Sequence, residues 1–138
     1  MLRHTLATLR FRLSRALDGA PADFGAFRPA GVRAPVEILS HMGDLMDWAL
    51  RQANGSPEWT VATPLAWDEE VARFFAALAK LEARVEAGPV ECEETRLFQG
   101  PIADALTHTG QIALLRRMHG APVKPMNYFK AEITSPGA

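Results

Sequence analysis

The sequence has little cysteine, no long apolar run and no excess of charge of either sign. Cys92 is the single cysteine among 138 residues, so no intramolecular disulfide can stabilise the chain. A chain of this length buries roughly 68–70% of the surface of its unfolded state, so one domain over residues 1–138 needs neither a disulfide nor a structural zinc. The lack of paired thiols fits a reducing cytoplasm, where we expect the protein to reside.

The balance of charge and the short apolar runs exclude two classes of partner. The 15 basic and 16 acidic residues give a net charge of -1. Because nonspecific affinity for nucleic acid is mostly electrostatic, we expect no nucleic-acid partner. No apolar run approaches the roughly 18 residues that cross a bilayer, so we expect no membrane partner.

Glycine, proline and the spacing of apolar residues predict four helices and weak strand signals. The predicted helices cover about 2–17, 35–53, 68–87 and 101–119. The best extended candidate is the short segment 58–62. We therefore expect an all-α four-helix bundle, whose long connections leave room for a crossover between helices.

The segment 102–115 has a single side chain that is ionised at neutral pH, the carboxylate of Asp104. We expect such an apolar helix to be buried on more than one side, so a carboxylate and an imidazole within it need a reason. Positions i and i+4 share a helix face, which places Asp104 beside His108, with Gln111 flanking them. This geometry suits metal ligands. Two simpler alternatives are an ion pair private to the helix and an Asp near the helix start that the helix dipole stabilises.

His41 on the second predicted helix is the candidate for a third ligand. A helical wheel places His41 at the edge of the apolar face, near Leu45 and Trp48. From that edge an imidazole can reach a cleft between helices. The alternative is a half-exposed His41 bonded to Glu37, one turn earlier.

Three further residues are candidates for supporting roles at this site. Gln111 could bond a ligand or a bound water, and Trp48 could form a pocket wall. Asp44 could orient the imidazole of His41 from one turn away. However, the wheel leaves four polar side chains of this helix to water: Ser40, Asp44, Asp47 and Arg51.

The remaining reactive or charged residues have simpler interpretations. Cys92 stands among glutamates that disfavour its thiolate, so we expect it to be inert. Arg116 and Arg117 could anchor an anion, but cations are common in the last turn of a helix. His119 is expected to be such a cation as well.

The motifs on the second and fourth predicted helices resemble those of the DinB/YfiT-like family of metalloenzymes. They are E-I-L-S-H over 37–41 and D-x-x-x-H-T-G-Q-I-x-L-L-R-R-x-x-G-A-P over 104–122. The similarity covers most of the chain from about Pro35 to Pro122. It implies a four-helix bundle with an up-down-down-up path.

The resemblance also implies a divalent metal ion bound by His41, Asp104 and His108. Asp104 stands where the family more often has a histidine. Two imidazoles and one carboxylate suit zinc, nickel, manganese or ferrous iron, so the ligand set does not identify the ion.

Relatives in this family imply two kinds of reaction on a small-molecule substrate. Some use a low-molecular-weight thiol, which would bind the metal, lose its proton and attack an electrophile as a thiolate. Others are metal-dependent hydrolases, in which an activated water takes the place of the thiol. We expect thiol transfer first and hydrolysis second.

A noncatalytic bundle that dimerises or binds a partner is the alternative from another class. The chain is 48% hydrophobic, which is much apolar surface for one small bundle to bury. Relatives of this fold often form dimers, and two-fold dimers are the commonest soluble assemblies. We expect a homodimer that leaves the metal site open to solvent.

Overall fold

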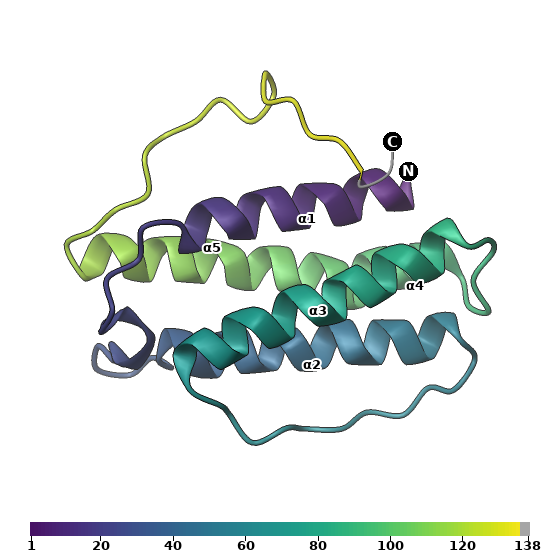
Figure 1. Cartoon of the computed structure of the whole chain (residues 1–138), viewed down its shortest axis with the longest axis horizontal. Coiled ribbons are helices and arrows are strands. Elements are labelled where there is room, and N and C mark those ends of the chain that lie inside the picture. The colour runs from purple at the N-terminus through teal and green to yellow at the C-terminus, as the bar shows by residue number, and fades with distance from the viewer. Residues whose placement is uncertain (136–138) are drawn as a thin grey trace.

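A computed structural model describes residues 1–135, and within them it is all helical, without strands. The all-α prediction is therefore confirmed, and the segment 58–62 forms no strand. The last three residues of the predicted domain lie outside the described residues. Four long helices form a bundle (Figure 1): α1 (Leu2–Leu17), α2 (Pro35–Ala53), α3 (Trp67–Glu86) and α5 (Ala103–Met118). Three short helical turns complete the order: η1 (Phe24–Ala26), α4 (Glu94–Leu97) and η2 (Phe98–Ile102).

The beginnings of α2 and α3 follow from local chemistry. Pro35 begins α2, where its fixed φ suits the first turn and its missing N–H is not needed. The Glu37 carboxylate accepts a hydrogen bond from the backbone N–H of Ala34 at 2.9 Å, which satisfies a donor at the helix start. The first turn of α3 carries three carboxylates that favour the positive end of the helix dipole.

The last predicted helix starts earlier than the sequence indicates. We expected it to open at Gly100 and Pro101, but the helical path already begins at Glu94. Pro101 lies inside a π-helical turn that joins α4 to α5. Proline cannot donate the usual i to i−4 bond, and a wider π turn accommodates that loss without ending the helix.

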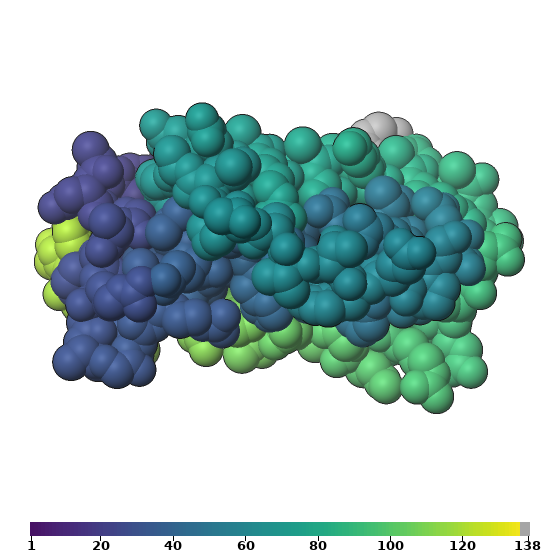
Figure 2. Space-filling view, turned by 90° about the horizontal axis from the view of Figure 1, so that it is seen from below, coloured from purple at the N-terminus to yellow at the C-terminus, as the bar shows by residue number. Residues whose placement is uncertain are grey.

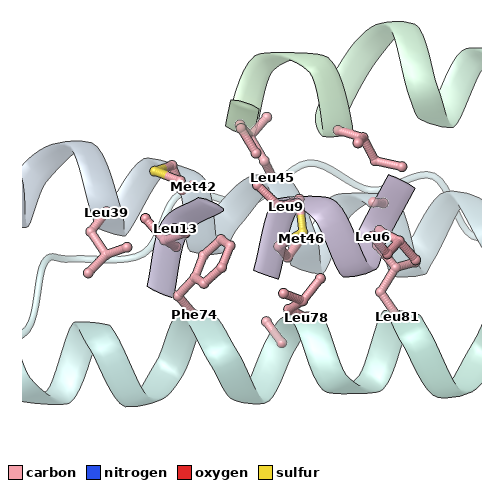
Figure 3. Packing of buried hydrophobic residues seen from close by; sticks show 14 of the residues in the cluster. Leu6, Leu9, Leu13, Leu39, Met42, Leu45, Met46, Phe74, Leu78 and Leu81 are labelled. Atoms are coloured by element: carbon pink, nitrogen blue, oxygen red, sulfur yellow. The ribbon is translucent and has the colours of Figure 1, made fainter. Parts of the chain in front are cut away.

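The core forms where leucine, methionine and phenylalanine side chains of the long helices meet (Figure 3). They recur three or four residues apart, so each helix directs one stripe inward. Fully buried members include Leu6, Leu9 and Leu13 of α1, Leu39, Met42 and Met46 of α2, and Phe74, Leu78 and Leu81 of α3. Each such burial contributes roughly 1.5–3 kcal/mol. The core therefore fixes the orientation of the long helices, and with it the positions of the polar side chains on α2 and α5.

A long segment, 54–66, connects α2 to α3. It runs back beside α2, so α3 begins at the end of the molecule where α2 begins (Figure 1). Seen from below the view of Figure 1, the segment lies across the face of α2 (Figure 2). The Asp44 carboxylate accepts the Ala62 N–H at 3.3 Å, and the Glu70 carboxylate accepts the Leu65 N–H at 3.3 Å, which fixes the segment in place.

The helical wheel was wrong in leaving Asp44 and Ser40 to water. Both are buried, and the side chain of Asp44 is 4% exposed. The cause lies in the packing, because α3 covers this side of α2 and places the guanidinium of Arg73 2.5 Å from the Asp44 carboxylate.

The helix α5 is buried against α1 and α2 and exposes one apolar stripe. Leu114 and Met118, one turn apart, are both exposed, as is Phe98 just before the helix. The homodimer stays a prediction, and this stripe is a surface that it could cover. Among the described helices, none is long and apolar enough to cross a membrane.

Replacing Gly25 with alanine is expected to destabilise the fold by about 1–3 kcal/mol, because an added methyl overpacks a filled site. A Cβ at Gly25 would lie 2.7 Å from the Trp67 side chain, which itself packs on the ring of Phe24. Gly110→Ala on α5 is the matched control, since nothing lies within 4 Å of its added Cβ and alanine favours helix. Urea unfolding of the two variants should shift in opposite directions, and equal midpoints would contradict this packing.

Candidate metal centre

The structure brings together three predicted ligands from two helices. His41 of α2 and Asp104 of α5 are 63 positions apart in sequence, yet the His41 Nε2 lies 3.4 Å from the Asp104 Oδ2. The Nε2 of His108 lies 3.4 Å from Oδ1 of the same carboxylate. The imidazole rings of His41 and His108 are nearly perpendicular, with centroids 4.9 Å apart.

These three side chains could hold a metal ion. One donor atom from each lies within 4.8 Å of the other two. Two donors bound to zinc at about 2.0–2.1 Å lie roughly 3.3 Å apart at a tetrahedral angle. The distances from Asp104 to the two histidines are close to this value, and they end on different carboxylate oxygens, Oδ2 for His41 and Oδ1 for His108. Within residues 1–135, no other group of three histidine, cysteine or acidic side chains has such geometry.

Two simpler explanations, an ion pair private to α5 and a bond between His41 and Glu37, do not describe the arrangement. Asp104 contacts histidines of both helices, so its contact with His108 is not an ion pair private to α5. Glu37, the alternative partner of His41, instead pairs with Arg28 and bonds the backbone of Ala34. The bond from Arg28, with that from Ala34, lowers the pKa of Glu37. Its carboxylate is therefore already engaged at the start of α2.

Gln111 contacts the second ring nitrogen of His108. The His108 Nδ1 lies 2.7 Å from the Gln111 Oε1. An amide oxygen accepts hydrogen bonds, so this contact suits the tautomer of His108 that carries its proton on Nδ1. In that tautomer the lone pair is on Nε2, the nitrogen that faces Asp104. A second contact of this kind is typical of histidines that bind metals, because it sets both tautomer and ring orientation.

The group is at the surface but not fully open. The side chain of Asp104 is 46% exposed, that of His41 27% and that of His108 10%. A small molecule can therefore reach the carboxylate side, while the side chain of His108 is mostly buried. The arrangement suits an ion that keeps open positions toward solvent.

An aromatic wall beside His41 comes from a residue that the sequence analysis missed. Trp59, in the segment 54–66, packs edge-on against His41 with centroids 6.1 Å apart. Trp48, which we expected as the wall, packs against Trp59 at 5.7 Å. A tryptophan within a nonperiodic connection was the only available signal, and its place depended on the path of that segment.

Asp44 does not take the role suggested for it. Its carboxylate bonds Arg73 and the backbone of Ala62, and no bond to His41 is found within the described part of the chain. Asp44 lies on the side of α2 that faces α3, whereas His41 faces α5. It therefore stabilises the connection and does not orient the imidazole.

Other residues singled out in the sequence lie outside the group. Burial and the nearby Glu93 and Glu94 raise the pKa of Cys92, against the opposing effect of Arg84, so its thiolate is disfavoured as expected. His119 packs on the rings of Phe24 and Phe27.

Comparison with known proteins returned no matching family model, no matching curated protein and no matching solved structure. The feature of the molecule that bears on function is therefore the geometry of His41, Asp104 and His108.

Proposed function

We propose that the protein is a metal-dependent enzyme of the DinB/YfiT-like type, with a divalent ion bound by His41, Asp104 and His108. The observation that carries this proposal is the approach of three donors from two helices, with the Gln111 amide beside the second ring nitrogen of His108. The return segment 54–66, which lets α2 and α3 start at one end of the bundle, supports an up-down-down-up path.

The charges of the group favour an anionic reactant. Two neutral imidazoles and one carboxylate sum to -1, so a divalent ion leaves a net positive centre. Such an ion with three protein ligands offers open positions where it lowers the pKa of a bound thiol or water. The exposed carboxylate side provides access, and the rings of Trp59 and Trp48 offer an apolar wall for a substrate.

The nucleophile comes from outside the chain. Cys92 is the only cysteine, and its raised pKa disfavours the thiolate. We therefore propose transfer of a low-molecular-weight thiol to an electrophilic small molecule as the first reaction, and hydrolysis as the second. Incubation of metal-loaded protein with a small thiol and an activated aryl halide distinguishes thiol transfer from hydrolysis. Only in thiol transfer does the sulfur replace the halide, which leaves as halide ion, and form a thioether.

Purified protein is expected to contain about one equivalent of divalent metal, and His41→Ala to lose it, because one of three ligands disappears. The protein is prepared without a polyhistidine tag or chelator, and its metals are measured by mass spectrometry. His4→Ala is the matched control, because His4 lies exposed on α1. Equal metal content in His41→Ala and wild type would show that the ion binds elsewhere.

A further inference from the structure

A pocket of about 670 Å³ opens at the end of the bundle where α1 and α5 finish. This volume is within the range of roughly 300–1,000 Å³ typical of small-molecule sites. Phe11, Leu17 and Phe75 give the pocket apolar surface. None of its lining residues belongs to the metal group, so the pocket is a separate feature of the molecule.

The polar part of this pocket is strongly cationic. Arg15, Arg116 and Lys124 line it, against one carboxylate, that of Asp18. Three positive charges and one negative charge leave a net charge of +2. Within residues 1–135, none of the three cations forms an ion pair.

Among the described residues, no counter-ion contacts the buried guanidinium of Arg116. Arg116 is 5% exposed, and its Nε and Nη1 donate to the backbone carbonyls of Ala121, Ala16 and Asp18 at 2.8–2.9 Å. Carbonyl groups carry only partial charges, so these bonds orient the cation but do not neutralise it. A buried charge without an opposite charge is unfavourable, and an anion in the pocket would correct this.

Arg15 adds an unused donor beside Arg116. Its Nη2 donates to the carbonyl of Lys124 at 2.7 Å, which fixes the segment after α5 over the pocket. Its Nε is buried and has no acceptor among the described residues. An unpaired charged donor and an unneutralised guanidinium therefore line one cavity.

We propose that this pocket binds a small amphiphilic anion, namely a carboxylate or phosphate group attached to an apolar chain or ring. Guanidinium groups form strong charge-assisted hydrogen bonds with the oxygens of both anions. The apolar body would pack against Phe11, Leu17 and Phe75. Because the pocket shares no residue with the metal group, the proposal stands or falls independently of the proposed enzyme function.

Calorimetric titration at low salt with octanoate, octyl phosphate and neutral octanol tests this proposal. We expect at least one anion to bind, with an affinity at least tenfold above that of octanol. Binding of octanoate alone would identify carboxylates as the ligand class, and binding of octyl phosphate alone would identify phosphates. Binding of octanol as tight as that of both anions would overturn the proposal, as would no binding of either anion.

Variants of the pocket cations then locate the binding site. Arg15→Gln and Lys124→Gln are each expected to weaken anion binding at least tenfold. Arg117→Gln is the matched control. Arg117 is an exposed cation next to Arg116 in the last turn of α5 and does not line the pocket, so this variant should bind the anion as wild type does. Arg116 is left intact because it holds two helix ends together. Unchanged binding in both Arg15→Gln and Lys124→Gln would overturn the assignment.

Discussion

Replacement of Arg73 by methionine is expected to lower the free energy of unfolding by about 3–5 kcal/mol, the cost of leaving buried charges without a partner. The guanidinium of Arg73 contacts the carboxylates of Asp44 at 2.5 Å, Asp47 at 3.2 Å and Glu70 at 3.3 Å. Asp44 is 4% exposed and Glu70 is 1% exposed. Without Arg73, these two buried carboxylates would lose their cation.

The electrostatics of this cluster agree with that expectation. Burial of the guanidinium acts to lower the pKa of Arg73, but the bond to Asp44 and the charges of Asp44 and Glu70 outweigh it, so the pKa is raised. The same carboxylates also accept backbone N–H groups of the segment 54–66. Loss of Arg73 would therefore loosen both the contact of α2 with α3 and the connection between them.

Urea unfolding, followed by far-UV circular dichroism, measures this loss. Arg96→Met is the matched control, because Arg96 pairs with Glu93 in a contact whose side chains are both 72% exposed. Exposed pairs contribute about 0–1 kcal/mol, so the control should differ little from wild type. If the two variants unfold at the same urea concentration, the buried cluster does not stabilise the fold.

The helix boundaries show which parts of the fold could be predicted from the sequence. The boundaries of α1 and α2 follow from local signals. Pro35 marks the first turn of α2, and a glycine follows the last turn of each helix. The start of the last helix did not follow from Pro101, because a proline in a first turn and one in a π turn have the same sequence signal. Only packing, which buries Pro101 and Ile102, distinguishes these two cases.

The candidate site was predictable only where its contacts are local. The spacing of Asp104, His108 and Gln111 along one helix gives their proximity directly. The position of Asp44 depended on which neighbour covers α2, and that of Trp59 depended on the path of 54–66. A single sequence contains no local signal for either, because both depend on contacts between distant elements.

Saturation with zinc is expected to raise the free energy of unfolding by about 2.7 kcal/mol when free ion is at 100 times Kd, and by about 4.1 kcal/mol at 1,000 times. The unfolded chain does not hold His41 near Asp104 and His108, so the ion favours the folded state. His108→Ala should abolish the gain, because two ligands remain. Because protons compete with the ion for imidazole nitrogens, the gain should also shrink in acid.

Gln111→Leu distinguishes a metal centre from three polar residues that are merely close. This variant keeps all three ligands but removes the amide that contacts Nδ1 of His108. Loss of such a contact lowers metal affinity by about 10- to 100-fold, which equals about 1.4–2.7 kcal/mol of the zinc-dependent gain. Thermal unfolding with and without zinc should therefore rank the proteins as wild type, Gln111→Leu and His108→Ala. A gain that is equal in all three would place the zinc at other residues and leave the proposed centre without support.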